Sequence, residues 1–118
     1  MTEKRLLEIL ESIKQVKIGV FGDFCLDSYW LLDDGPIEYS IETNRRTFSV
    51  KKQKYSLGGA GNVVWNMADL GVQKVYAVGV IGDDLFGREM LRKMEGMKID
   101  TSSIIIQKNN WEIGRAHV

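Results

Sequence analysis

Two short segments contain residue types that together could bind a polyhydroxylated or anionic ligand. The first, Gly22-Asp23-Phe24-Cys25-Leu26-Asp27, follows an apolar run, and the second, Gly58-Gly59-Ala60-Gly61-Asn62, begins an amphipathic stretch. A glycine run lets backbone amides approach a ligand closely, and a helix that starts there supplies unpaired N–H groups. Asp27 adds a carboxylate and Asn62 a carboxamide, and both groups can form hydrogen bonds with hydroxyl groups.

Each of these residues also has a simpler interpretation. A single aspartate after a strand is often a turn or cap residue, and a glycine-rich junction can require small residues only for packing, with Asn62 as a helix cap. The combination favours ligand binding, because parallel α/β sheets bind ligands beyond the carboxyl ends of their strands, where Asp27 is expected. If the carboxylate were buried there, each hydrogen bond that it accepted from a hydroxyl group would stabilise the complex by about 1.5–3 kcal/mol.

The sequence around these segments predicts alternating helices and strands. Apolar residues at helical spacing predict a helix over residues 3–15, and mostly apolar runs predict strands at 16–21, 74–81 and 103–107. Two further helices are expected, one from the glycine run to Gly71, where a left-handed C′ glycine would end it, and one ending at Gly96. Their apolar stripes are expected to consist of Val63, Val64, Met67, Ala68 and Leu70, and of Phe86, Met90, Leu91 and Met94. This order predicts an α/β fold with right-handed crossovers and a parallel sheet.

The segment between the two glycine motifs has a different character. Asp33-Asp34-Gly35-Pro36 is a turn signal, and the polar residues that follow include Phe48 and Val50 in alternation with Ser49 and Lys51. This pattern predicts a small antiparallel excursion rather than part of the main sheet. Its basic residues are simplest to explain as a solvated sheet face; they are Arg45, Arg46, Lys51, Lys52 and Lys54.

The composition excludes several classes of partner and site. The chain has 16 basic and 16 acidic residues, so its net charge of zero favours neither nucleic acid nor an anionic membrane as a partner. With one cysteine and one histidine, neither an internal disulfide nor a Cys/His zinc site is expected, and Cys25 is interpreted as a packed thiol. The sequence shows no signal peptide or membrane-spanning run, and a cytoplasmic location is expected.

Three motifs in order resemble those of the ribokinase-like (PfkB) carbohydrate kinase family. They are the segment ending at Asp27, the glycine run, and Gly82-Asp83-Asp84-Leu85-Phe86-Gly87, and the resemblance covers residues 16–107. The first motif, read through Trp30, is most similar to the heptose phosphate kinase branch. The resemblance implies the N-terminal part of a ribokinase-like fold, a mainly parallel sheet flanked by helices, with a small antiparallel β lid at about residues 36–56.

The resemblance also implies roles for individual residues. Asp27, Gly58, Gly59 and Asn62 would contact the sugar, and Arg45 and Arg46 in the lid would contact a phosphate on the substrate. The glycine run is one residue shorter than in ribokinase itself, which leaves open which glycine makes which contact. The third motif has the glycine spacing of a P-loop, but Arg88 and Glu89 replace the Lys and Ser/Thr that a P-loop needs, so a structural role is expected.

By this resemblance, the full-length enzyme would use ATP and Mg²⁺ to phosphorylate a hydroxyl of a sugar or sugar phosphate, and the lid could mediate a homodimer. The family's catalytic base lies in a later Gly-Ala-Gly-Asp segment, which this sequence does not contain. We therefore expect no catalytic, cofactor-binding or metal-binding residue in this chain, and no kinase activity from it alone. The alternative is a non-catalytic sugar-binding or dimerisation module.

Residues 1–111 are accordingly interpreted as an incomplete N-terminal portion of a kinase domain. Residues 112–118 resemble a translated sequencing adapter, although they could also be an ordinary polar tail. No chemical role is assigned to His117 in either case.

Overall fold

The computed structural model describes residues 1–33, 35, 38–47 and 49–108 of the protein. Several sequence predictions fall outside the described residues. These are Phe48, positions 34 and 36 of the predicted 33–36 turn, and the 112–118 tail with His117. The chain divides into two compact units. The first comprises Met1–Leu26 and the chain from Leu57 onward, and the second comprises Asp27–Ser56.

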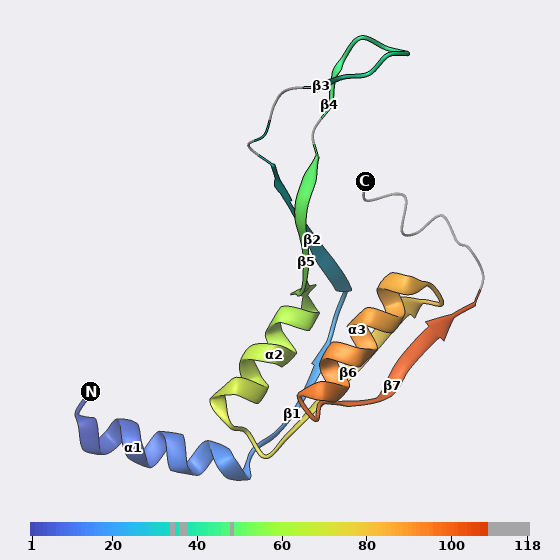
Figure 1. Ribbon diagram of the computed structural model, residues 1–118. Helices are drawn as coiled ribbons and strands as arrows, with labels where there is room; N and C mark the ends of the chain where they lie inside the picture. The colour runs from blue at the N-terminus through green and yellow to red at the C-terminus, as the bar shows by residue number, and fades with distance from the viewer. Residues whose placement is uncertain (34, 36–37, 48, 109–118) are drawn as a thin grey trace. The chain divides into compact units, whose positions relative to one another are not determined.

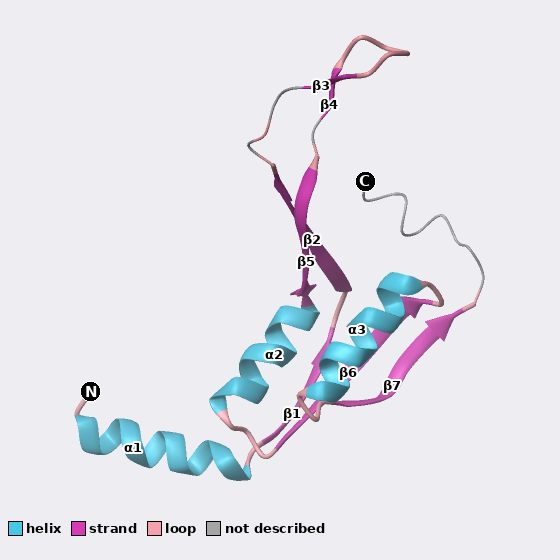
Figure 2. Cartoon of the chain, viewed as in Figure 1, coloured by secondary structure: helices cyan, strands magenta, loops and turns pink. Residues whose placement is uncertain are grey.

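The first unit contains a parallel three-stranded sheet. Its strands, in the order β1-β6-β7, are β1 (Lys17–Phe21), β6 (Lys74–Gly82) and β7 (Asp100–Gln107). Helix α2 (Ala60–Leu70) precedes β6, and α3 (Leu85–Gly96) connects β6 to β7 (Figure 1; Figure 2). The predicted α/β architecture with a parallel sheet is therefore confirmed.

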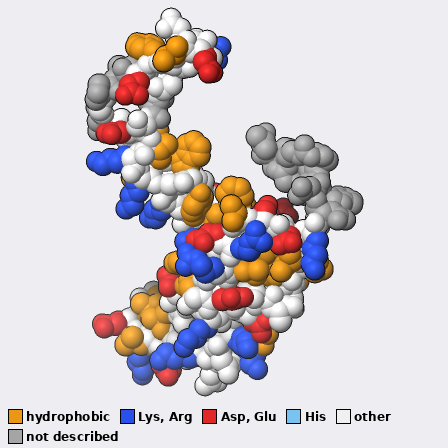
Figure 3. Space-filling model, turned by 45° about the vertical axis from the view of Figure 1, so that its right-hand side comes forward, with side chains coloured by type: hydrophobic (Ala, Val, Ile, Leu, Met, Phe, Trp, Pro, Cys, Tyr) orange, Lys and Arg blue, Asp and Glu red, His pale blue; other side chains and the backbone are white. Residues whose placement is uncertain are grey.

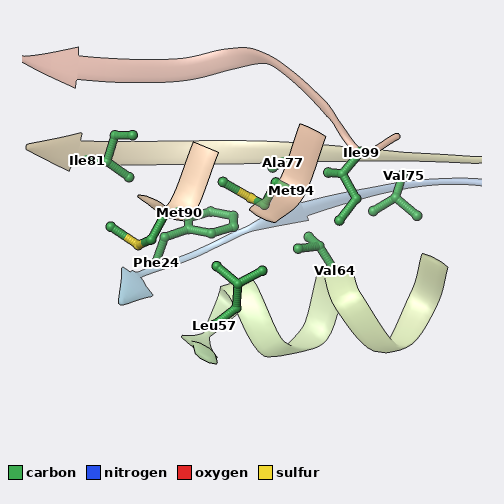
Figure 4. Packing of buried hydrophobic residues seen from close by; sticks show 9 residues of the cluster. All are labelled: Phe24, Leu57, Val64, Val75, Ala77, Ile81, Met90, Met94 and Ile99. Atoms are coloured by element: carbon green, nitrogen blue, oxygen red, sulfur yellow. The ribbon is translucent and has the colours of Figure 1, made fainter. Parts of the chain in front are cut away.

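One core lies between the sheet and these two helices. Residues of β6 alternate between buried and more exposed positions, as expected for a strand covered on one face. Figure 4 shows side chains from β6, α2 and α3 meeting in this core. The buried hydrophobic residues are Phe24, Leu57, Val64, Val75, Ala77, Ile81, Met90, Met94 and Ile99.

The predicted helix stripes are only partly correct. In α2, Val64 is fully buried and Met67 and Ala68 pack against the core, whereas Val63 and Leu70 are exposed. Gly61 takes one of the inward positions and is buried beside Leu57. The row that faces the core therefore runs through Gly61, Val64 and Ala68, a spacing that an apolar count alone does not recognise.

In α3, Met90 and Met94 are buried, but Phe86 is exposed and Gly87 takes the inward position. Helix α2 is followed by Gly71 in the left-handed conformation, as predicted. Gly96 is the last residue of α3, as predicted, and Lys98 beyond it is in the left-handed conformation (φ 61°). Its N–H donates to the Glu95 carbonyl at 2.9 Å and the Ile99 N–H donates to the Met94 carbonyl at 3.0 Å, a Schellman arrangement.

The predicted N-terminal helix is present as α1 (Glu3–Ser12) followed by a single 3₁₀ turn, η1 (Ile13–Gln15). Thr2 caps α1, because its side-chain oxygen accepts a hydrogen bond from the Arg5 N–H at 3.1 Å. Charged side chains of both signs are interspersed over the face drawn in Figure 3, in keeping with the zero net charge. In the part of the chain that the structure describes, no helix is long and apolar enough to cross a membrane.

The second unit is built from short β pairs. Strand β3 (Glu38–Tyr39) pairs antiparallel with β4 (Arg46–Thr47), in agreement with the predicted excursion. Strand β2 (Phe24–Leu32) pairs with β5 (Val50–Gly59), and both strands have residues in each unit. The sequence reasoning missed β2, because its Tyr29-Trp30-Leu31-Leu32 run does not alternate with polar residues.

The carboxylate of Asp100 provides a test of pH dependence. It accepts hydrogen bonds from the Ser102 hydroxyl and N–H and lies 3.5 Å from the Lys74 Nζ, and these contacts, those of Ser102 above all, lower the pKa of Asp100. A carboxyl whose pKa is lower in the folded state stabilises the fold above its unfolded-state pKa. This stabilisation is lost as the pH falls through the folded-state value.

We expect Asp100→Asn to lower the urea midpoint slightly at neutral pH and to weaken the loss of stability below about pH 4. Ser102→Ala should act in the same direction, because it removes the hydroxyl from the same carboxylate. Urea denaturation across this pH range measures both effects. If the stability of Asp100→Asn and of the parent protein fell equally steeply with decreasing pH, the carboxylate would not contribute to the pH dependence of stability.

Candidate functional site

The first glycine motif runs along one edge of the central strand β6. The Gly22 N–H donates to the Val78 carbonyl at 3.3 Å. Gly79 of β6 leaves room for residues 22–24. A Cβ added to Gly79 would lie 2.7 Å from the Phe24 Cδ2 and 2.8 Å from the Gly22 carbonyl oxygen. Segment 22–24 is therefore in tight contact with β6.

The second glycine motif contacts the same segment from another side. The Ala60 N–H, at the start of α2, donates to the Asp23 carbonyl at 2.8 Å. Gly59 has φ 56° and ψ −131°, and a Cβ added there would lie 2.5 Å from that same carbonyl oxygen. Only glycine combines this backbone conformation with such a close approach. The structure thus brings the first and second motifs into direct backbone contact.

The residues predicted to bind sugar are distributed over both units. Gly58 is buried near the end of β5, Gly59 is the exposed last residue of that strand, and Asn62 is exposed in the first turn of α2. Asp27 is exposed on β2 and belongs to the second unit. The structure places Gly58, Gly59 and Asn62 together at one junction, and it describes Asp27 in a separate unit.

The alternative interpretation of Asn62 as a helix cap is wrong. The N-cap residue of α2 is Gly59, which has no side chain to cap the helix, and Asn62 is the third residue inside the helix. Its carboxamide is exposed at the helix N-terminus. At such an end, backbone N–H groups and the positive end of the helix dipole favour an electron-rich ligand group.

The two arginines predicted to contact a phosphate lie in the second unit. Arg46 is in β4, and Arg45 precedes it, with its carbonyl accepting a hydrogen bond from the Ser40 N–H at 2.8 Å. Both residues are exposed. Their neighbour Asn44 has φ 53°, which turns the chain between β3 and β4.

The third motif forms a compact strand-to-helix junction. Asp84 is the N-cap of α3, and its carboxylate accepts a hydrogen bond from the Gly87 N–H at 2.7 Å. A Cβ added to Gly87 would overlap the Gly82 carbonyl oxygen. The Asp83 N–H donates to the Gln107 carbonyl of β7 at 3.0 Å. These contacts support the structural role that the sequence suggested for this motif.

Sequence reasoning did not identify Gly79, Phe24 or the Asp23 carbonyl as parts of the site. One signal was available, because a glycine inside an apolar strand often marks the close approach of another backbone. Cys25, interpreted as a packed thiol, is exposed, and its sulfur would lie 3.4 Å from a Cβ at Gly59. Among the described residues, no group of three or more His, Cys, Asp or Glu side chains is arranged to hold a metal ion.

The model of the pfkB family carbohydrate kinases matches residues 26–116. Bifunctional protein HldE of Helicobacter acinonychis is 40% identical over 93 residues, which are 78% of this chain and 19% of that protein. HldE of Aliarcobacter butzleri is 39% identical over 97 residues, 81% of this chain and 20% of that protein. The chain thus spans about a fifth of the length of these curated relatives.

Solved structures have a similar fold. The fructokinase of Halothermothrix orenii superposes with a TM-score of 0.54 at 23% identity, covering 80% of this chain and 30% of that one. A fructokinase of Xylella fastidiosa with bound ATP has a TM-score of 0.54 at 26% identity, covering 78% of this chain and 24% of that one. The fold of this chain is therefore ribokinase-like.

Proposed function

Because this chain belongs to the pfkB family of carbohydrate kinases, we propose that the protein transfers the γ-phosphoryl group of ATP to a hydroxyl of a sugar or sugar phosphate in the cytoplasm. The observation that carries the proposal is the family match over residues 26–116. The backbone contact between the first two motifs also supports the proposal, because it holds the glycine run at the N-terminus of α2, where it could bind a ligand. The similarity of Gly22–Trp30 to the heptose phosphate kinase branch favours a phosphorylated sugar.

In this proposal, the chain supplies the sugar-binding part of the enzyme. It corresponds to about a fifth of the length of its curated relatives, and residues 1–111 are taken as the N-terminal portion of the kinase domain. The catalytic base, the nucleotide site and the residues that hold Mg²⁺ would lie elsewhere in the longer protein. Alone, this portion would bind sugar without phosphorylating it.

Each proposed contact follows from the chemistry of its residue. Asp27 would accept hydrogen bonds from vicinal hydroxyls, and Asn62 would bind a further hydroxyl at the helix N-terminus. Gly58 and Gly59 would let the backbone approach the sugar ring. Phosphoryl transfer depends on positioning and charge neutralisation, so these residues contribute by holding the acceptor hydroxyl in line with the γ-phosphate.

Arg45 and Arg46 are proposed to bind the phosphate of a sugar phosphate. A guanidinium group offers a planar set of donors that matches phosphate oxygens. Both side chains are exposed in the second unit, which supports access by a charged ligand.

The second unit is also proposed to mediate a homodimer. Tyr29 and Leu31, which lie on one face of β2, and Trp30 on the opposite face are all more than half exposed. Isolated two-stranded pairs are marginally stable in water, and clustered exposed apolar side chains often mark interaction surfaces. Sedimentation of the full-length protein tests this proposal, and a monomer at micromolar concentration would contradict it.

We expect Asp27→Ala in the full-length protein to weaken sugar binding by about 2 kcal/mol, or roughly 30-fold, because charge-assisted hydrogen bonds to hydroxyls are lost. The KM for ATP should stay nearly unchanged. Steady-state kinetics with each substrate varied in turn measures both values. Glu42→Ala is the control, since it removes another exposed carboxylate from the same unit. An equal loss for sugar and ATP would reject Asp27 as a sugar ligand.

The activity itself is tested by sugar-dependent formation of ADP with the full-length protein and a set of sugars and sugar phosphates. Turnover with at least one acceptor supports the kinase. Sugar binding by calorimetry without ADP formation would instead support a non-catalytic binding module.

A further inference from the structure

We propose that Gly79 is a positioning residue that holds the sugar-binding glycine run in place, although it lies on the central strand and outside all three motifs. This inference rests on the proposed function. Gly79 acts through segment 22–24, which lies between β6 and the start of α2.

A side chain at position 79 would collide with the Phe24 ring. A Cβ at position 79 would lie 2.7 Å from Cδ2 and 2.8 Å from Cε2 of the Phe24 ring. It would also lie 2.8 Å from the Gly22 carbonyl oxygen. Real Cβ atoms do not tolerate such distances, so a side chain at position 79 must displace the ring, the backbone at Gly22, or both.

The Phe24 ring has little room to move, because it is buried in the core. Phe24 is 8% exposed and belongs to the core together with Leu57 of β5, Ile81 of β6 and Met90 of α3 (Figure 4). Protein cores are close-packed, so a displaced ring forces its neighbours or its own backbone to shift. The backbone of segment 22–24 therefore absorbs part of the displacement.

The backbone of segment 22–24 also contacts the glycine run. The Asp23 carbonyl accepts the hydrogen bond from the Ala60 N–H at 2.8 Å, and its oxygen lies 2.5 Å from where a Cβ of Gly59 would be. Gly22 packs on the other side of the junction, where its own added Cβ would be 3.2 Å from the Ala60 Cβ. A shift of segment 22–24 must therefore move Ala60 and the neighbouring Gly59 or break the hydrogen bond.

The test compares Gly79→Ala with Gly19→Ala in the full-length protein. Gly19 lies on β1 of the same sheet, and a Cβ added there meets no atom within 4 Å. We expect Gly79→Ala to raise the KM for the sugar about tenfold or more with the KM for ATP unchanged, because small displacements of positioning groups have large kinetic effects. Gly19→Ala should leave both values unchanged.

A second readout is hydrogen exchange of the Ala60 amide, which does not depend on activity. It should become at least about tenfold faster in Gly79→Ala and stay unchanged in Gly19→Ala, because exchange reports local opening of the hydrogen bond. Lower thermal stability in Gly79→Ala with unchanged sugar KM and unchanged Ala60 exchange would overturn the proposal, since Gly79 would then serve packing alone.

The two hypotheses can fail separately. If the parent protein shows no sugar-dependent ADP formation, the proposed function fails, whereas faster Ala60 exchange in Gly79→Ala would still establish the mechanical link. If Gly79→Ala does not fold, Phe24→Leu tests the same link, because it removes ring atoms that lie against Gly79. Unchanged Ala60 exchange and unchanged sugar KM in Phe24→Leu would overturn the proposal.

Discussion

Gly59→Ala is expected to destabilise the protein by about 3 kcal/mol or more, the combined effect of backbone strain and steric overlap. At φ 56° and ψ −131° an L-residue with a side chain is strained. The new Cβ would also lie 2.5 Å from the Asp23 carbonyl oxygen, which is backbone and cannot rotate away. The hydrogen bond from the Ala60 N–H to that oxygen should be lost as well.

Gly71→Ala measures the cost of a positive φ without a close approach. Gly71 also has a positive φ, 88°, but a Cβ added there meets no atom within 4 Å. It should therefore show only the conformational cost of about 1–2 kcal/mol. Urea denaturation of both variants measures the difference. Equal losses in the two variants would mean that the close approach to Asp23 contributes nothing.

Gly87→Ala should cost a similar amount, about 3 kcal/mol, for a different reason. The added Cβ would overlap the Gly82 carbonyl oxygen, so the start of α3 would have to move away from the end of β6. That movement would stretch the 2.7 Å hydrogen bond from the Gly87 N–H to the Asp84 carboxylate. Loss of such a cap alone costs about 0.5–2 kcal/mol.

Gly96→Ala is the matched control in the same helix. A Cβ added to Gly96 meets no atom within 4 Å, and alanine has the higher helix propensity, so this variant should equal or exceed the parent protein in stability by up to about 1 kcal/mol. Thermal denaturation of the two variants side by side checks the contrast. A stable Gly87→Ala protein would show that the third motif does not need its second glycine.

Much of the fold could be predicted from the sequence, because hydrophobic periodicity is local and the alternation of strands and helices along the chain implies parallel crossovers. The parallel sheet and its helices were predicted, as was the left-handed Gly71. The prediction of which helix faces are buried was less accurate. Gly61 and Gly87 occupy buried positions, but glycine does not count as apolar in a hydrophobic pattern. The end of α3 at Gly96 was predicted, but the left-handed Lys98 beyond it was not, because the Schellman turn there involves the buried Ile99.

The candidate site was predictable in its residue types but not in its geometry. The order of the motifs indicated the family, and the family match confirms that inference. The contact between Asp23 and Ala60 joins residues that are distant in sequence, and it depends on the backbone angles of Gly59. No pattern of neighbouring residues encodes such a contact. The roles of Asp27, Asn62 and the two arginines remain proposals.

The division of the chain at Leu26 and Leu57 suggests a route to new substrate preferences. Asp27–Ser56 is one continuous stretch that forms its own compact unit, whereas the glycines at positions 22, 59, 79 and 87 belong to the other unit. We expect residues 27–56 to behave as an exchangeable cassette, which could be grafted from a related kinase or randomised in a library. The glycine framework would then stay constant while the cassette varies Asp27 and the two arginines, the residues proposed above to contact the substrate.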